Sequence, residues 1–193
     1  MCSSHRRGSN NAVAEYVVTA ASSLLRRFVW ADAEIRAGRY REFRAKMLAD
    51  NLSGLDGLTA GLVGLGVIGL AVAEALHRNS CNILYYDPAP RDPRAAAAFG
   101  AKSVSLDELL KTSDVVTLHV PLLPSTQGLI TARELALMKR GAIVIQASRG
   151  GIVDEAALAA ALNSGHLGGA AVDVYSTEPP AANNPLLTLS GDV

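Results

Sequence analysis

Hydrophobic residues in the first part of the chain recur at the spacing of a helix. Over residues 12–38 they come every third or fourth position, at Val13, Val17, Ala20, Leu24, Phe28, Ala31 and Ile35. This period predicts one long amphipathic helix that is capped by an asparagine at position 10 or 11 and ends at Gly38.

The segments on either side of this helix are polar. Residues 1–11 predict a disordered tail and residues 39–57 an irregular connection, so that residues 12–57 form a crossover helix with its connection. From residue 58 onward, short apolar runs alternate with helical stretches. The apolar runs predict strands at residues 58–63, 82–86, 102–104, 115–120, 142–146 and 169–174.

The predicted strands are apolar at successive positions rather than at alternate ones. That pattern is typical of a parallel sheet whose two faces are both covered by helices. Helical stretches ending near residues 78, 99, 111, 139 and 163 supply such covering helices. We therefore predict an α/β fold, a Rossmann-type doubly wound parallel sheet, for the domain over residues 58–193.

Composition and charge narrow the classes of function. Lys plus Arg and Asp plus Glu both number 18, so no net field favours nucleic acid or an anionic membrane as a partner. No apolar run approaches the roughly 20 residues that a membrane helix needs. Two cysteines, Cys2 and Cys81, imply no disulfide framework. We expect a cytoplasmic protein without a metal site.

A glycine-rich turn stands between the first predicted strand and the helix after it. Gly64, Gly66 and Gly69 have the spacing Gly-x-Gly-x-x-Gly. The first glycine permits a tight turn, the second lets the backbone approach a pyrophosphate, and the third lets helix and strand pack closely. The following helix, with Val67 and Ile68 in its first turn, presents free N–H groups to phosphates. The turn therefore predicts a dinucleotide site.

Asp87 ends the second predicted strand. A carboxylate there can accept hydrogen bonds from the adenosine ribose and would repel a 2′-phosphate, which favours NAD over NADP. The alternative is an ordinary turn aspartate before Pro88. Arg91 and Arg94 follow closely and keep NADP open as a second cofactor.

Five segments together resemble the D-isomer-specific 2-hydroxyacid dehydrogenase family. The glycine turn with Asp87 is one, and the other four are residues 11–15 (Asn-Ala-Val-Ala-Glu), 120–126 (Val-Pro-Leu-Leu-Pro-Ser-Thr), 148–155 (Ser-Arg-Gly-Gly-Ile-Val-Asp-Glu) and 171–179 (Ala-Val-Asp-Val-Tyr through Glu-Pro). The resemblance covers nearly all of residues 10–193, and the last two segments are its most specific part. The segment 120–126 is most similar to phosphoglycerate dehydrogenases.

The resemblance implies an NAD-dependent oxidoreductase that passes hydride between NAD and a small 2-hydroxy or 2-oxo acid. It implies that Arg149 binds the substrate carboxylate and that Glu178 supports a catalytic histidine. Without the matching segments, both would be read as ordinary solvated side chains. The residues that it places along the cofactor, besides the glycine turn and Asp87, are Val120, Pro121, Thr126, Ala147, Ser148, Arg149 and Asp173. It also implies a homodimer to which the long apolar stripe contributes.

The chain departs from the family pattern at its ends. The family's acid–base histidine lies in a Pro-His pair beyond the point that matches Val193, and most of its substrate domain precedes the crossover helix. We therefore expect a fragment that binds NAD but lacks most of the substrate domain and turns over little substrate. His119 is expected to pack in its strand rather than to act as the base. Gln146 stands where the family usually has asparagine.

Two other functions stay open. The family includes transcriptional corepressors, so the main alternative is a noncatalytic NAD-binding module. A different Rossmann enzyme, such as a 3-hydroxyacid dehydrogenase, is the second. Such enzymes usually start close to the glycine turn and lack the segment from Arg149 to Glu155.

Overall fold

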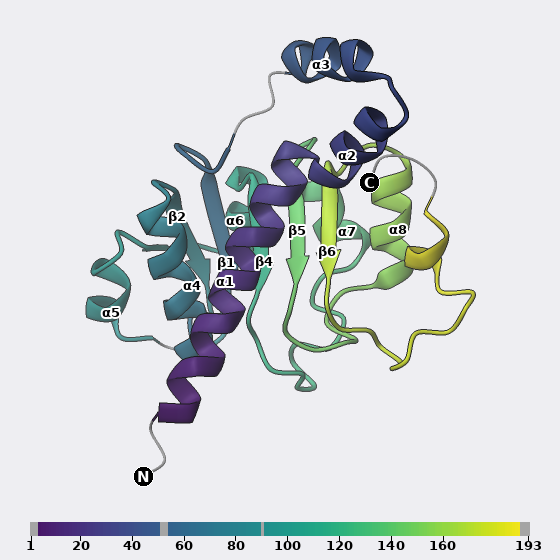
Figure 1. Cartoon of the computed structure of the whole chain (residues 1–193). Coiled ribbons are helices and arrows are strands. Elements are labelled where there is room, and N and C mark those ends of the chain that lie inside the picture. The colour runs from purple at the N-terminus through teal and green to yellow at the C-terminus, as the bar shows by residue number, and fades with distance from the viewer. Residues whose placement is uncertain (1–3, 51–53, 90, 190–193) are drawn as a thin grey trace.

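The computed structural model describes residues 4–50, 54–89 and 91–189 of the chain (Figure 1). Six parallel strands form one sheet in the order β3-β2-β1-β4-β5-β6. The chain winds outward from β1 to β3, crosses back to β4, and winds outward again to β6. This order confirms the predicted doubly wound α/β fold. The strands are β1 (Thr59–Val63), β2 (Asn82–Tyr86), β3 (Lys102–Ser103), β4 (Val115–Leu118), β5 (Ile143–Gln146) and β6 (Gly169–Val172).

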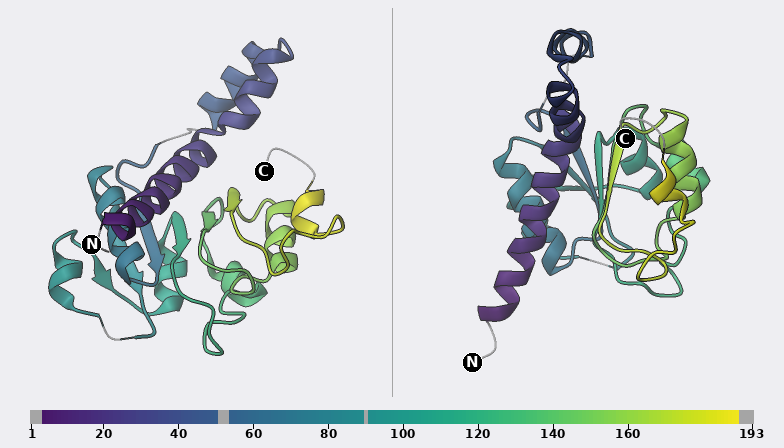
Figure 2. Two further views of the ribbon diagram at one scale, coloured as in Figure 1. Left: turned by 60° about the horizontal axis from the view of Figure 1, so that its bottom comes forward. Right: turned by 45° about the vertical axis from the view of Figure 1, so that its right-hand side comes forward.

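Helices cover both faces of the sheet (Figure 2). One face carries α1 (Ser4–Arg26), α4 (Val67–Arg78) and α5 (Pro93–Ala97). The other carries α6 (Leu106–Thr112), α7 (Ala132–Leu137) and α8 (Glu155–Asn163), with the 3-10 turn η1 (Pro185–Thr188) packed beside α8.

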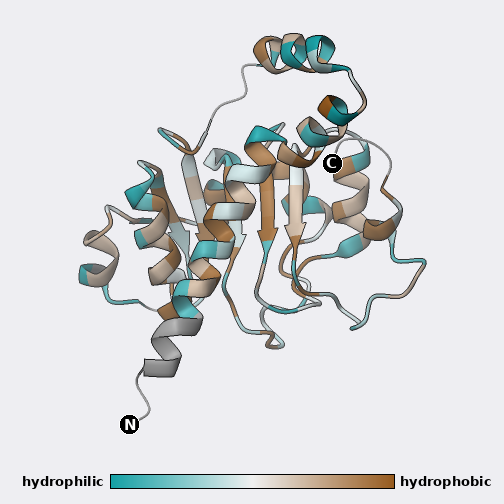
Figure 3. Cartoon of the chain, viewed as in Figure 1, coloured by the Kyte–Doolittle hydropathy of each residue, from teal (hydrophilic) through white to brown (hydrophobic). Residues whose placement is uncertain are grey.

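Each layer of helices encloses an apolar core of its own. In β4, Val115 packs into the core under α1 and α4, and the next residue, Val116, packs into the core on the opposite face. Successive strand residues are apolar because both faces of the strand are buried. Strand β5 is strongly apolar, and its neighbour at the edge of the sheet, β6, is much less so (Figure 3).

The first helix differs from its prediction in where it begins. It starts at Ser4, so residues 4–11 are helical and the disordered tail predicted there is wrong, while residues 1–3 lie outside the described part of the chain. The polar residues 4–11 carry no apolar stripe, so hydrophobic periodicity gave no sign of a helix there.

The predicted single helix is also interrupted. Arg27 has a left-handed backbone (φ 50°, ψ 48°), and the chain continues as α2 (Phe28–Arg36), which is followed by Gly38 at φ 77°. Val17 in α1 is fully buried, whereas Phe28 and Ile35 beyond the break are 56% and 49% exposed. The break therefore divides the apolar stripe into a packed half and an exposed half.

The predicted irregular connection contains a helix, α3 (Tyr40–Ala49), while residues 51–53 lie outside the described residues. Phe43 is its only buried residue, and its ring meets that of Trp30 edge-on at 5.0 Å. A single buried residue leaves no apolar period to detect. The helices α2 and α3 stand beyond the amino ends of the strands (Figure 1).

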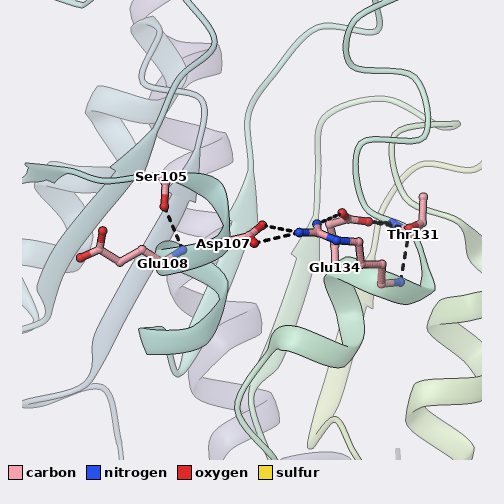
Figure 4. Close-up of polar contacts among 6 residues, drawn as sticks. Ser105, Asp107, Glu108, Thr131 and Glu134 are labelled. Carbon is pink, nitrogen blue, oxygen red and sulfur yellow. Dashed lines mark hydrogen bonds and ion pairs between the residues drawn. The ribbon is translucent and has the colours of Figure 1, made fainter.

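Charged side chains join α6 to α7 on the face opposite α1 (Figure 4). Thr131 and Glu134 form a capping box, in which the Glu134 carboxylate accepts the Thr131 N–H at 3.0 Å. Arg133 bridges Glu134 to Asp107, reaching Asp107 Oδ2 at 2.8 Å. Burial raises the pKa of Glu134, but hydrogen bonds from Thr131 and Arg133 outweigh burial and lower the pKa to about 2.

Within the described ranges, no helix is both long and apolar enough to cross a membrane. The same residues hold no group of three or more His, Cys, Asp or Glu side chains that could bind a metal ion.

Candidate functional site

The carboxyl ends of the strands meet at one edge of the sheet, the lower edge in Figure 1. The glycine turn follows β1, Asp87 follows β2, and Val120 lies just after β4, while Arg149 follows β5 and Asp173 follows β6. Open α/β sheets bind ligands at this edge, where the strand order reverses, which here is between β1 and β4. The structure therefore brings the residues predicted from separate segments to one edge.

The three glycines of the turn differ in their surroundings. A Cβ atom at Gly64 (φ 102°) would lie 2.8 Å from the carbonyl carbon of His119, and one at Gly69 would lie 2.2 Å from the Gly64 oxygen. A Cβ at Gly66 would meet nothing within 4 Å. Gly64 and Gly69 are therefore required by packing, whereas the backbone at Gly66 is bare and fits the close approach of a pyrophosphate.

The helix after the turn begins without a side-chain cap. Gly66 is its N-cap, and no described side chain accepts a hydrogen bond from its first turn. Val67 and Ile68 there are 71% and 36% exposed. The free N–H groups and the positive end of this 12-residue helix are suited to an anionic group.

Asp87 is bound to the glycine turn as well as to its own loop. Its Oδ2 accepts the Leu65 N–H at 2.7 Å and the Arg91 Nε–H at 2.6 Å, and its Oδ1 accepts the Ala89 N–H at 2.9 Å. Burial raises the pKa of Asp87, but these hydrogen bonds outweigh it and lower the pKa below its ordinary value. Asp87 is therefore ionised and ties the end of β2 to the turn, a pairing that sequence reasoning missed.

Thr126 holds the loop after β4. It is 1% exposed, and its hydroxyl donates to the Pro121 carbonyl at 2.6 Å and accepts the Leu123 N–H at 2.8 Å. Val120 is buried beside the glycine turn, because a Cβ at Gly64 would lie 2.9 Å from its Cγ1. The Thr126 hydroxyl therefore forms its hydrogen bonds within the loop. Pro121 in the same loop is exposed.

Gln146 holds the loop after β5. Its Oε1 accepts the Ser148 hydroxyl at 2.7 Å, and its Nε2 donates to the Arg149 carbonyl at 2.9 Å. Ala147, between them, is half-buried. The Arg149 side chain is exposed and donates to the Ser148 carbonyl at 2.6 Å. Among the described residues it belongs to no ion pair, so its guanidinium can receive an anion.

The loop after β6 is packed directly against the loop after β5. A Cβ at Gly150 would lie 1.8 Å from the Tyr175 carbonyl oxygen, so only glycine fits there. Glu155 accepts the Ser176 N–H and the Asn184 side-chain amide, each at 2.6 Å. Glu178 is exposed and accepts the Tyr175 N–H at 3.1 Å. The role of Glu155 is a second contact that sequence reasoning missed.

Asp173 and His119 complete the edge. Asp173 is exposed, and its N–H donates to the Gln146 carbonyl at 2.9 Å. The His119 Nε2 lies 2.9 Å from the Thr117 hydroxyl, and burial lowers the pKa of His119 to about 4. His119 is therefore neutral at pH 7, and it lies one residue beyond the end of β4 rather than within the strand as predicted.

The reversal of strand order, the bare glycine turn and the carboxylate at the end of β2 define a dinucleotide-binding α/β domain. The sequence matches, over residues 18–191, the family described as D-isomer specific 2-hydroxyacid dehydrogenase, NAD binding domain. The chain belongs to this family, and its cofactor is NAD.

Relatives of known name support the same assignment. The chain is 41% identical to D-3-phosphoglycerate dehydrogenase of Archaeoglobus fulgidus over 96% of its own length and 34% of that protein. It superposes on a Granulicella formate dehydrogenase with a TM-score of 0.84 and 28% identity. On a glyoxylate reductase from Paecilomyes thermophila it superposes with a TM-score of 0.77 and 34% identity.

These alignments cover only part of each relative. The chain spans about a third of the length of the curated relatives that it matches. The superposition on the formate dehydrogenase includes 93% of this chain and 47% of that protein. The superposition on the glyoxylate reductase includes 92% of this chain and 52% of that protein.

Proposed function

We propose that this chain is the cofactor-binding part of an NAD-dependent D-2-hydroxyacid dehydrogenase, which passes hydride between the nicotinamide and C2 of a 2-hydroxy or 2-oxo acid. One observation carries the proposal: the bare glycine turn lies at the same edge of the sheet as the exposed guanidinium of Arg149, which forms no ion pair with any described residue. Within this class, phosphoglycerate dehydrogenase is the favoured member, because the curated relatives of that name are 37–41% identical to the chain.

The cofactor-binding residues follow from their places around the turn. Gly64, Gly66 and Gly69, with Val67 and Ile68, would hold the pyrophosphate, and Asp87 would face the adenosine ribose. The loops after the next three strands would lie along the rest of the dinucleotide, through Val120, Pro121, Thr126, Ala147, Ser148, Arg149 and Asp173. When bound, NAD supplies the hydride acceptor, and the chain supplies position and charge.

Arg149 and Glu178 are the proposed substrate-side residues. An exposed guanidinium presents paired N–H donors that match a carboxylate, so Arg149 would orient the acid group of the substrate. Glu178 would orient and stabilise the histidine that takes the hydroxyl proton. His119 does not fit that role, because its Nε2 lies 2.9 Å from the Thr117 hydroxyl and burial lowers its pKa to about 4.

Replacing Gly66 tests the proposed cofactor site. A Gly66→Val side chain has free space in the protein alone and would occupy the position of the pyrophosphate. We expect the variant to fold normally by circular dichroism and to lose NADH binding measured by fluorescence titration. Unchanged binding would refute the proposed position of the pyrophosphate. Gly54→Val, at another glycine with open surroundings and no positive φ, is the matched control and should bind NADH normally.

We also propose a homodimer formed through α2 and the neighbouring edge of the sheet. Phe28, Val29 and Ile35 are 56%, 82% and 49% exposed, and a groove of about 430 Å³ beside them reaches Gly168 and Ala170 at β6. A second copy would cover this apolar surface. Light scattering should give twice the chain mass, and Val29→Glu should give the monomer. A stable wild-type monomer would count against the proposed dimer.

The expected cytoplasmic location stays a prediction.

A further inference from the structure

We propose that Arg91 sets the balance between NAD(H) and NADP(H) in this site. It neutralises Asp87 when the adenosine ribose carries a 2′-hydroxyl, and it binds the phosphate when the ribose carries a 2′-phosphate. The inference rests on the proposed binding of a dinucleotide at the glycine turn and assigns the cofactor selectivity of that site.

The guanidinium of Arg91 covers the carboxylate that would otherwise select against NADP. Arg91 Nε lies 2.6 Å from Asp87 Oδ2, and the side chains of Arg91 and Asp87 are 37% and 2% exposed. The same Oδ2 accepts the Leu65 N–H of the glycine turn. A ligand that reaches this corner from solvent therefore meets the guanidinium first and the carboxylate beneath it.

This arrangement changes the charge that a 2′-phosphate would encounter. A bare carboxylate repels a phosphate, whereas an ion pair presents little net charge and an outward guanidinium. Among the contacts of the described residues, Arg91 uses only Nε, so both of its terminal nitrogens remain for a ligand. Paired N–H donors of this kind match the oxygens of a phosphate.

The same contacts reduce what Asp87 can offer to a ribose hydroxyl. Asp87 accepts three hydrogen bonds from Leu65, Ala89 and Arg91, out of roughly four acceptor sites on a carboxylate. Removing Arg91 frees one of these sites. The loss of Arg91 should therefore weaken NADPH binding without weakening NADH binding, and the ratio of the two affinities reports the role of Arg91.

Arg94 provides a matched control on the same segment. It carries the same charge three residues further along the chain and is exposed, and within the described residues its side chain forms no ion pair. Arg94→Ala changes the net charge as much as Arg91→Ala does but leaves Asp87 covered. A difference between these two variants therefore measures the position of Arg91 and not the charge of the chain.

The experiment is a fluorescence titration of the full chain with NADH and with NADPH, for the wild type and for Arg91→Ala, Arg91→Lys and Arg94→Ala. We expect Arg91→Ala to lower the affinity for NADPH about tenfold, while the affinity for NADH stays the same or rises. Arg91→Lys keeps the charge but loses the planar fork, so it should lie between wild type and Arg91→Ala. Arg94→Ala should keep the wild-type ratio.

Two outcomes overturn the inference alone. Equal losses for both cofactors in Arg91→Ala would place Arg91 against a part of the dinucleotide that NADH and NADPH share. Unchanged affinities for both cofactors in both Arg91 variants would show that Arg91 does not reach the 2′-position. If the wild type bound neither cofactor, the proposed function would fail and this inference with it. Circular dichroism of each variant separates lost binding from lost folding.

Discussion

Polar side chains that cap helices in this domain also connect one helix to the next. Glu134 accepts hydrogen bonds from Thr131 in its own capping box, and Arg133 joins it to Asp107 on α6 (Figure 4). Because Glu134 is buried and ionised, its hydrogen bonds have to replace those that water would make. These contacts depend on the charge of one carboxyl group and are therefore sensitive to pH.

Glu134→Gln should destabilise the protein at neutral pH but much less in strong acid. The folded-state pKa of Glu134 is about 2, below the ordinary value of 4.5, so its contribution is complete above pH 4.5 and is lost as the pH falls through about 2. We expect a loss of about 1–2 kcal/mol in the free energy of unfolding at pH 7.

Urea unfolding followed across pH values measures this difference. The gap between wild type and variant should shrink below pH 4, and a gap that stays constant down to pH 2.5 would contradict the assignment. Glu108→Gln is the control, because Glu108 lies on the same helix pair with an exposed side chain that makes no ion pair among the described contacts.

At the scale of elements, the sequence predicted what depends on burial and missed what depends on single contacts. Strand β2 spans the predicted residues, because four of its five residues, Ile83 to Tyr86, form a continuous run that is at least partly buried between the two layers of helices. The break at Arg27 leaves the apolar period intact on both sides, so the period could not reveal it. The helix α3 buries one residue and has no period at all.

The candidate site likewise has features that the sequence predicted and features that it did not. The glycine spacing predicted the turn and the carboxyl-edge position, because those depend on local backbone geometry. The sequence did not predict that Asp87 pairs with Arg91 or that the Thr126 hydroxyl donates to the Pro121 carbonyl in its own loop. It also did not predict that Glu155 holds the segment carrying Glu178. Such contacts depend on how side chains from different loops meet in space.

Glu155→Gln should loosen the segment that follows β6. Glu155 uses both carboxylate oxygens, one for the Ser176 N–H and one for the Asn184 amide, and glutamine has a single acceptor oxygen. The NH₂ group of the glutamine would face either the Ser176 N–H or the Asn184 amide, both of which are donors. We expect backbone amides in residues 174–188 to exchange with deuterium about tenfold faster, as the loss of one charge-assisted hydrogen bond implies.

Asp154→Asn is the matched control for this measurement. Asp154 is the neighbouring carboxylate and caps α8 by accepting the Ala157 N–H at 3.0 Å, and within the described contacts it does not touch residues 174–188. Exchange should change in α8 and not in the segment after β6. If both variants, or neither, change exchange in residues 174–188, Glu155 does not hold that segment.

At the scale of the whole molecule, we expect this chain to supply cofactor binding but not proton transfer. The proposed cofactor residues follow the carboxyl ends of β1, β2, β4, β5 and β6. None of the three histidines with described side chains fits the general base. His119 is buried, His166 contacts the Leu135 carbonyl at 3.1 Å, and His77 lies in the last turn of α4 beside Phe99.

We therefore expect the 193-residue polypeptide by itself to bind NADH and to turn over substrate poorly. A general base contributes about 10²- to 10⁴-fold to such a reaction, and a closed site contributes more by positioning the substrate and excluding water. The measurement is NADH oxidation with hydroxypyruvate, glyoxylate and phosphohydroxypyruvate. It is made first on this polypeptide and then on a fusion that adds a family substrate domain and a Pro-His segment. Activity should appear in the fusion and fall again in its Arg149→Ala variant.

Full activity of the polypeptide alone would show that a residue within it acts as the base, and loss of that activity in His119→Gln would identify His119. A fusion that binds NADH and stays inert would favour a noncatalytic NAD-binding module of the corepressor kind.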